Sequence, residues 1–216
     1  MNDVTEVKIR SYQEEDRKAI REISIQSSIF GEYRNAVFDD EILADLLTSY
    51  FTDCEPTSSF VAEKGVCIIG YLLGTKDTRK MHKVLKQKII PLVAKDLLHK
   101  GRLFQKKNLL LIKNIMFSYL KGEFKVPDFT HEYPATLHVN IVSQFRGQNV
   151  GSFLVNHFLN FLKKERVPGV HFGVLSEKAK KFFLNLDFEV LFIGKYTFLN
   201  YLTEENLPHY IMGKKC

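Results

Sequence analysis

The hydrophobic pattern changes its period most sharply between residues 137 and 164. Apolar and polar residues alternate over 137–141, whereas apolar residues recur every three or four positions over 154–162. A period of two is typical of a strand, and a period of about 3.6 is typical of a helix. The pattern therefore predicts a strand, a tight polar loop at 146–151 and a helix.

The predicted loop has the composition of an anion-binding turn. Gly147 and Gly151 allow the backbone to turn sharply, and Asn149 is one of the few residues that readily adopts a positive φ. A helix that begins here leaves several backbone N–H groups unpaired and adds roughly half a positive charge. The sequence therefore predicts that phosphate binds at the start of this helix.

The first 75 residues predict a strand, two helices and a hairpin. The strand lies at 7–10, the first helix at 14–26, and the hairpin at 60–73 with a turn at its glycine. The second helix follows Asp39 and Asp40, which we expect to act as caps or as acids of its first turn. This order of elements occurs in many α+β domains.

Residues 76–125 hold the excess positive charge of the chain. They contain fourteen Lys and Arg against three Asp and Glu, a local balance of +11, whereas the whole chain carries +6. Two helical patterns occupy the segment, and Pro91 either kinks the first or begins a new helix. The charge fits either a solvated lysine-rich face or a basic rim that attracts an anionic partner.

The sequence after residue 125 predicts three more strands and one more helix, in addition to the strand and helix on either side of the loop at 146–151. A connector punctuated by prolines leads to the central strand. The later elements are a strand at 170–175, a helix capped by Ser176 that runs to Leu186, a buried strand at 188–193 and a last antiparallel strand at 209–214.

Composition narrows the class of protein. With 216 residues, 45% of them hydrophobic, the chain can bury a sizeable core in one domain. No apolar run approaches the ~18 residues of a membrane span and the N-terminus lacks a secretory pattern, so we expect a cytoplasmic protein without a membrane partner. Cys54, Cys67 and Cys216 are widely spaced, and we expect inert, buried thiols without a disulfide framework or a metal site.

Residues 146–151, Arg-Gly-Gln-Asn-Val-Gly, resemble the acyl-CoA signature Q/R-x-x-G-x-G/A of the GNAT acetyltransferase superfamily. Arg146 and Gly151 match its first and last positions, whereas Asn149 stands where the middle glycine is usual. The resemblance implies an α+β GNAT fold, with a mixed, mostly antiparallel sheet that is splayed at its centre and flanked by helices. The chain would then be a single domain, 1–216, in which residues 76–125 are a basic helical insertion before the central strand.

The resemblance extends through the second half of the chain. Residues 133–151 and 169–191 are similar to a GNAT subgroup related to the acetyltransferase-like domain of O-GlcNAcase, which typically shows Y-P-A-x-L-H-I, a glycine-rich loop and G-V-H-L-G-V. The subgroup implies acetyl-CoA as cosubstrate, with its pyrophosphate held by the loop. The residues that the resemblance assigns to acetyl-CoA binding are Ile141, Val142, Arg146, Gly147, Gln148, Asn149, Val150, Gly151, Ser152 and Ser176.

The proton-accepting group that the subgroup implies is replaced. A backbone N–H of the central strand, at Ile141 or Val142, would stabilise the charge that develops on the thioester oxygen. Asn140 stands where the subgroup commonly has an aspartate, and an amide takes no proton at neutral pH. His138 lies on the same strand face and is either a base with a pKa near 6.5 or a hydrogen-bonded structural histidine.

The proton-donating group is replaced as well. Phe183 stands where family members often have a tyrosine that protonates the departing thiolate. Tyr196, Tyr201 or Tyr210 could lie nearby, or the thiolate could leave unassisted. The sequence therefore predicts an acetyl-CoA-dependent N-acetyltransferase for an unidentified primary amine, or a catalytically impaired acyl-CoA-binding or interaction protein with the same fold. Nucleic acid is not an expected partner, and the oligomeric state is left open.

Overall fold

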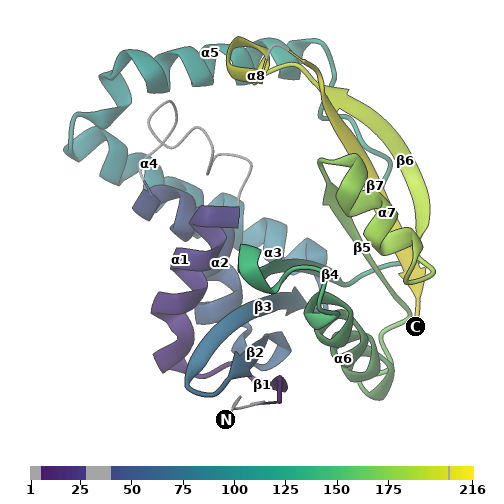
Figure 1. Ribbon diagram of the computed structural model, residues 1–216. Helices are drawn as coiled ribbons and strands as arrows, with labels where there is room; N and C mark the ends of the chain where they lie inside the picture. Colours follow the sequence, from purple (N-terminus) through teal and green to yellow (C-terminus); the bar gives the residue numbers. More distant parts are fainter. Residues whose placement is uncertain (1–5, 28–39, 204) are drawn as a thin grey trace.

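The computed structural model describes residues 6–27, 40–203 and 205–216 (Figure 1). Its strands are β1 (Lys8–Ser11), β2 (Phe60–Lys64), β3 (Cys67–Thr75), β4 (Thr136–Ile141), β5 (Gly169–Val174), β6 (Glu189–Tyr196) and β7 (Leu207–Lys215). Its α-helices are α1 (Arg17–Ser27), α2 (Asp40–Cys54), α3 (Thr78–Val84), α4 (Ile90–His99), α5 (Lys106–Leu120), α6 (Val150–Lys164), α7 (Glu177–Leu184) and α8 (Asn200–Thr203). Short helical turns are Glu14–Asp16, Pro56–Ser58, Leu85–Ile89, Arg102–Phe104 and Ser143–Phe145. Asp39, one of the two expected helix acids, lies outside the described residues.

The strands form two sheets that touch at one bridge. The first sheet has the order β1-β2-β3-β4 and the second has the order β5-β7-β6, and every pair in both is antiparallel. The sheets meet through an isolated parallel bridge between Ala135 and Val170, and beyond it β4 and β5 diverge (Figure 1). The expected α+β fold, with a mostly antiparallel sheet that splays at its centre, is confirmed.

Helix α6 packs against both sheets. Its Leu154 and Phe158 are fully buried in a core cluster that also contains Leu72 of the first sheet and Met212 of the second. Phe158 lies so close to β3 that a Cβ atom on Gly74 would come within 2.3 Å of its ring. A glycine at position 74 therefore permits the helix to approach the sheet.

Helices α1 and α2 cover the opposite face of the first sheet. Successive side chains of β3 point to opposite faces, so that Leu72 packs in the α6 cluster, whereas Tyr71 and Leu73 pack in a second cluster. That second cluster includes Ile20 of α1 and Tyr50 of α2. Both faces of β3 are buried, which explains its long run of apolar residues.

The basic segment between β3 and β4 folds into α3, α4 and α5. Before Pro91, a π-helical turn lets the Ile90 N–H donate to the Leu85 carbonyl, and Pro91 then stands in the first turn of α4. The backbone stays right-handed helical at Val84, Leu85, Ile89 and Ile90, so the helical path from α3 to α4 is unbroken. Of the two expected roles of Pro91, a kink in a continuing helix is therefore favoured over the start of a new one. Leu111 of α5 is buried against Leu199 at the start of α8, and Figure 1 shows α4 and α5 leading the chain from α2 across to the β6–β7 side.

Two expectations for the second half need correction. The strand at 188–193 is not buried, because β6 is an edge strand that pairs with β7 alone among the described residues, and Ile193 is 69% exposed. Helix α7 ends at Leu184 instead of Leu186, because the chain turns there and reaches a φ of 59° at Asp187. The last strand is confirmed, and β7 lies antiparallel between β5 and β6.

We expect Phe158→Ala to lower the free energy of unfolding by about 3–5 kcal/mol, because the ring is fully buried and its removal leaves a cavity. The matched control on the same helix is Phe153→Ala: Phe153 is 51% exposed, and its loss should change stability by less than about 0.5 kcal/mol. Urea unfolding of both variants measures the two values. Similar losses in the two variants would show that Phe158 does not fill the core between the sheets.

Candidate functional site

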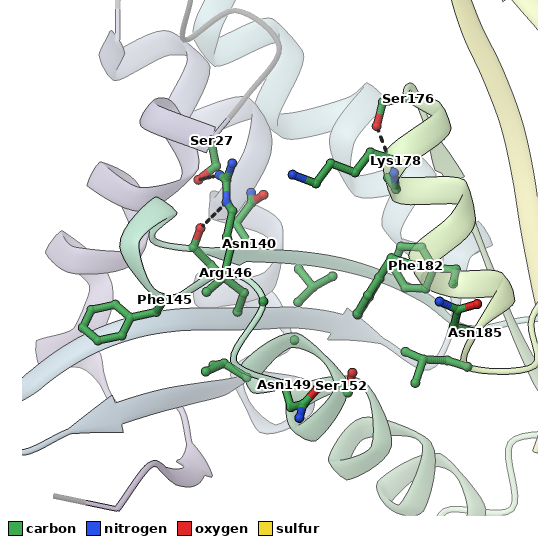
Figure 2. A pocket seen from close by; sticks show the side chains of 18 residues that line it. Ser27, Asn140, Phe145, Arg146, Asn149, Ser152, Ser176, Lys178, Phe182 and Asn185 are labelled. Atoms are coloured by element: carbon green, nitrogen blue, oxygen red, sulfur yellow. Dashed lines mark hydrogen bonds between the residues drawn. The ribbon is translucent and has the colours of Figure 1, made fainter. Parts of the chain in front are cut away.

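A cleft of about 640 Å³ lies between the end of β4, the start of α6 and one side of α7 (Figure 2). Its walls come from residues 139–141, from the loop that follows, from the first turn of α6 and from residues between 176 and 186. The expected site residues that line this cleft are Asn140, Ile141, Arg146, Gly147, Asn149, Val150, Gly151, Ser152 and Ser176.

The start of α6 presents unpaired backbone donors to the cleft. Asn149 precedes the helix with a φ of 61°, in the left-handed region that the sequence predicted, and its side chain makes no capping hydrogen bond. The first backbone bond of the helix runs from the Phe153 N–H to the Asn149 carbonyl, at 3.0 Å. The N–H groups of Val150, Gly151 and Ser152 therefore lie before the helical hydrogen-bond ladder and have no partner in it.

Two cations border the same cleft. The Arg146 guanidinium is held in place by its Nε, which donates to the Ile141 carbonyl at 3.0 Å, and by its Nη2, which lies 3.3 Å from the Ser27 hydroxyl. Lys178 reaches across the cleft from α7 toward the side where Arg146 lies (Figure 2). Together with the positive end of α6, these charges favour an anionic ligand. Sequence reasoning missed Lys178, because no motif distinguishes it from the other lysines.

Two of the residues expected to bind acetyl-CoA, Gln148 and Val142, do not line the cleft. The Gln148 amide donates to the Gln144 carbonyl at 3.1 Å, and the Val142 N–H donates to the Ile69 carbonyl of β3 at 3.0 Å. Hydrogen-bonded positions alternate along an antiparallel strand, so the N–H groups of Val139 and Ile141 point away from β3, toward the open edge of β4. Of the two alternatives, Ile141 has its N–H on the open edge and Val142 does not.

A second cavity of about 530 Å³ adjoins the first across the splay. It lies between Leu137 and His138 of β4, Leu47 of α2 and the end of β5. Asn140 and Phe183 line both cavities, so the two spaces meet at these side chains. The divergence of β4 from β5 therefore creates room on both sides of the sheet.

A buried hydrogen-bond network positions Asn140. Its Nδ2 donates to the Tyr71 hydroxyl at 2.8 Å and lies 3.0 Å from Nε2 of His138. Because Nδ2 can only donate, His138 accepts through Nε2, and the ring also bonds to the backbone of Leu47. Both protons of the amide are used, which leaves the side-chain oxygen as the polar atom that Asn140 offers to the cavities. Tyr71 was missed by sequence reasoning because it reads as a core residue of β3.

Burial keeps this network neutral. It lowers the pKa of His138 to about 4, with the Leu47 backbone opposing the shift. Burial also raises the pKa of the fully enclosed Tyr71 hydroxyl. Of the two alternatives for His138, a base with a pKa near 6.5 does not fit this lowered pKa, and the geometry favours a hydrogen-bonded structural histidine.

The three expected tyrosines lie away from the two cavities. The Tyr210 hydroxyl donates to Glu177, and the Tyr196 ring stacks on His209. Tyr201 is half-buried, with its hydroxyl enclosed and without a partner among the described residues. Phe183, which stands where the resemblance implies an acid, is buried edge-on against Phe172, with 4.5 Å between the ring centres.

Metal ligands, membrane-spanning helices and reactive thiols are the other features that the sequence analysis addressed. Residues 6–27, 40–203 and 205–216 contain no cluster of His, Cys, Asp and Glu that could hold a metal ion. No helix among them is long and apolar enough to cross a membrane. Cys54, Cys67 and Cys216 are free thiols, but all three are exposed, so the expectation that they are buried is wrong.

Comparison with known proteins supports the fold. No family model and no curated protein matches the chain. The crystal structure of SsHAT is 23% identical, with a TM-score of 0.69 over 97% of this chain and 98% of that one. A GCN5-related N-acetyltransferase from Kribbella flavida is 14% identical, with a TM-score of 0.58 over 97% and 98%. The yncA protein of Salmonella typhimurium, solved with its cofactor acetyl-CoA, is 12% identical, with a TM-score of 0.55 over 97% and 93%. The chain therefore has the fold of GNAT acetyltransferases over nearly its whole length.

We expect the protein to lose stability as the pH falls from about 6.5 toward about 4, partly through His138. In this window the unfolded chain binds a proton at His138 that the folded protein excludes, so protonation favours unfolding. From pH ~7.5 to pH ~4.5, the free energy of unfolding of the wild type should fall by about 1–2 kcal/mol more than that of His138→Gln. This is less than the full pKa shift would give, because the His138 ring is partly exposed and solvent screens its charge. Urea unfolding at the two pH values measures the difference. Equal losses in the two proteins would mean that His138 titrates normally in the folded state.

Proposed function

We propose that the protein is an acetyl-CoA-dependent N-acetyltransferase that acts on a primary amine. The observation that carries this proposal is the row of unpaired N–H groups at the start of α6, flanked by Arg146 and Lys178, in a cleft that adjoins the splay. Acetyl-CoA supplies a thioester carbonyl. A C–N bond to the amine forms there as the C–S bond breaks, the amine loses a proton and the thiolate gains one.

The start of α6 would hold the pyrophosphate. The N–H groups of Val150, Gly151 and Ser152 supply directed donors, and Arg146 and Lys178 supply charge. The resemblance also assigns Gln148 to this task, but its side chain is engaged with the loop backbone, so we assign it to shaping the loop. Ser176 borders the same cleft while its hydroxyl caps α7 through the Ala179 N–H.

The open edge of β4 would hold the acyl end. The N–H groups of Val139 and Ile141 point into the splay, where they can donate to the thioester oxygen as negative charge develops. Backbone donors of this kind are fixed by the strand and do not depend on side-chain identity. We therefore assign the stabilising N–H to Ile141 or to its neighbour on the same edge, Val139.

The second cavity would admit the amine. The Asn140 oxygen can accept a hydrogen bond from the nitrogen and orient it, but it cannot take the proton. His138 is a weak base because of its lowered pKa, and its Nε2 already accepts from Asn140. We propose that the amine enters in its neutral form and that its proton leaves through water.

The residues at positions 140 and 183 favour a second candidate function. With Asn140 in place of an aspartate and Phe183 in place of a tyrosine, the site lacks both side chains that the resemblance assigns to proton transfer. The protein would then bind acyl-CoA and act through interaction with a partner. The acetyl-CoA cleft is common to both functions, so turnover separates them and binding does not.

We also propose that the whole chain, 1–216, is one GNAT domain and that residues 76–125 are an insertion. Helices α3, α4 and α5 all lie between β3 and β4, which are adjacent strands of one sheet and could be joined by a shorter connection. The similarity to the O-GlcNAcase-related subgroup rests on the motifs at 133–151 and 169–191.

We expect Gly147→Val to weaken acetyl-CoA binding at least tenfold, because Gly147 has a φ of 81° that valine rarely adopts, so the loop must change shape. The matched control is Gly101→Val: Gly101 has a φ of 62°, is equally open, and lies between α4 and α5. Calorimetric titration with acetyl-CoA and with desulfo-CoA measures the loss. The control should bind as the wild type does. An unchanged affinity in Gly147→Val would place the pyrophosphate elsewhere.

We expect Asn140→Asp to raise turnover of primary amines by about 100-fold or more, because a carboxylate at this position can accept the amine proton. Asn140→Ala, which removes the amide without adding a base, should not raise turnover. Acetylation of an amine panel, followed as CoA release, measures both. If acetyl-CoA binds to the wild type and to Asn140→Asp while neither turns over any amine, the interaction function is favoured.

A further inference from the structure

Helix α5 has two apolar sides, and only one of them is covered by the described part of the chain. Asn108, Leu111 and Ser118 are buried, and Leu111 packs against Leu199 and Leu207. These buried positions follow a helical spacing and mark the side that faces the protein.

The opposite side forms an exposed apolar surface. At about 100° per residue, its members fall within an arc of roughly 120° that lies directly opposite the buried positions. They are Leu109, 47% exposed, Leu110, 38%, Met116, 56%, Phe117, 51%, and Leu120, 72%. We call these five residues the α5 outer face. A solvent-facing side would ordinarily be polar, so this face has the composition of a contact surface.

Two further exposed aromatic residues lie near the two ends of α5, outside the α5 outer face. Phe104 precedes the helix and is 70% exposed, and Tyr119, in its last turn, is 67% exposed. A tyrosine ring, with an apolar body and a polar hydroxyl, is suited to a boundary between apolar and wet surroundings.

Charge accompanies this apolar surface. The sequence of α5 contains no Asp or Glu, and its Lys106 and Lys113 fall within the same arc as the outer face. The Lys113 amine lies 5.9 Å from the centre of the Phe117 ring, so cation and apolar surface are in contact. Residues 76–125 as a whole carry a balance of +11. The partner is therefore expected to be anionic.

The combination identifies the kind of partner. A second copy of this chain would place one strongly basic segment against another, which opposes association through this face. An anionic lipid surface accepts both features, since apolar side chains enter the acyl boundary while lysine stems extend to the headgroups. We propose that α5 docks the protein on the surface of an anionic membrane, lying in the interface without crossing it.

This proposal departs from the expectation of no membrane partner, because that expectation rested on the lack of a spanning segment and a helix can lie in the interface without spanning it. It is also independent of the proposed acetyltransferase activity, because none of its residues borders the two cavities described above.

The test is flotation of the full chain with vesicles of phosphatidylcholine alone and with vesicles that contain roughly 30% phosphatidylserine. We expect at least tenfold more protein to float with the anionic vesicles, and this excess to fall as salt is raised, since each lysine near such a surface contributes attraction that salt screens. Equal flotation with both vesicles, or none with either, would overturn the proposal.

Variants locate the contact on the α5 outer face. Met116→Ser with Leu120→Ser should lower flotation at least fivefold, and Lys106→Glu with Lys113→Glu should lower it roughly tenfold or more. Ile193→Ser is the matched control, because Ile193 is 69% exposed on β6, and its flotation should equal that of the wild type. Circular dichroism checks that each variant is folded. Wild-type flotation in both double variants would overturn the proposal. A second outcome would also overturn it: no binding to vesicles, together with a dimer in sedimentation that dissociates in the Met116→Ser, Leu120→Ser variant. The partner of the α5 outer face would then be a second copy of the chain.

Discussion

The divergence of β4 from β5 is the constraint on which the rest of the structure depends. Strands that run side by side normally pair, and an open strand edge leaves N–H and C=O groups that need other partners. Pairing here stops after the bridge between Ala135 and Val170. Beyond it, Arg146 Nε donates a hydrogen bond to the Ile141 carbonyl. The N–H groups of Val139 and Ile141 face the gap between the two strands instead of a paired strand.

Helix α6 holds the diverging sheets in one core and also supplies the charge at the mouth of the cleft. Phe158 and its neighbours fill the core shared by the two sheets, and the same helix begins at Asn149 beside the open edge of β4. Packing and electrostatics are thus coupled through one rigid element, because a shift of α6 that closed the gap would also move its N-terminal donors. The left-handed turn at Asn149 sets the direction in which those donors point.

The sequence predicted what short-range patterns encode and missed what depends on distant contacts. The strand, loop and helix around residue 146 follow from periodicity and from residues that tolerate positive φ, so their placement was predictable. The state of His138 was not predictable, because its pKa is lowered by burial, and residues that surround it, Leu47 of α2 and Tyr71 of β3, are far away in sequence. Nor was the exposure of β6 at Ile193, since an apolar run does not reveal whether a strand lies at an edge. The role of Lys178 was not predictable either, because it depends on where α7 lies relative to the loop at 146–151.

The identity of residue 140 links stability to chemistry. Its neighbours Tyr71 and His138 are neutral for the same reason, which is burial between β3, β4 and the helices above them. An aspartate there would add a charge to a region where charge is unfavourable, whereas an amide satisfies both neighbours without one. The amide therefore favours the folded state and at the same time removes a proton acceptor. Any acyl transfer by this site would then depend on the backbone donors of β4 and on an amine that arrives already neutral.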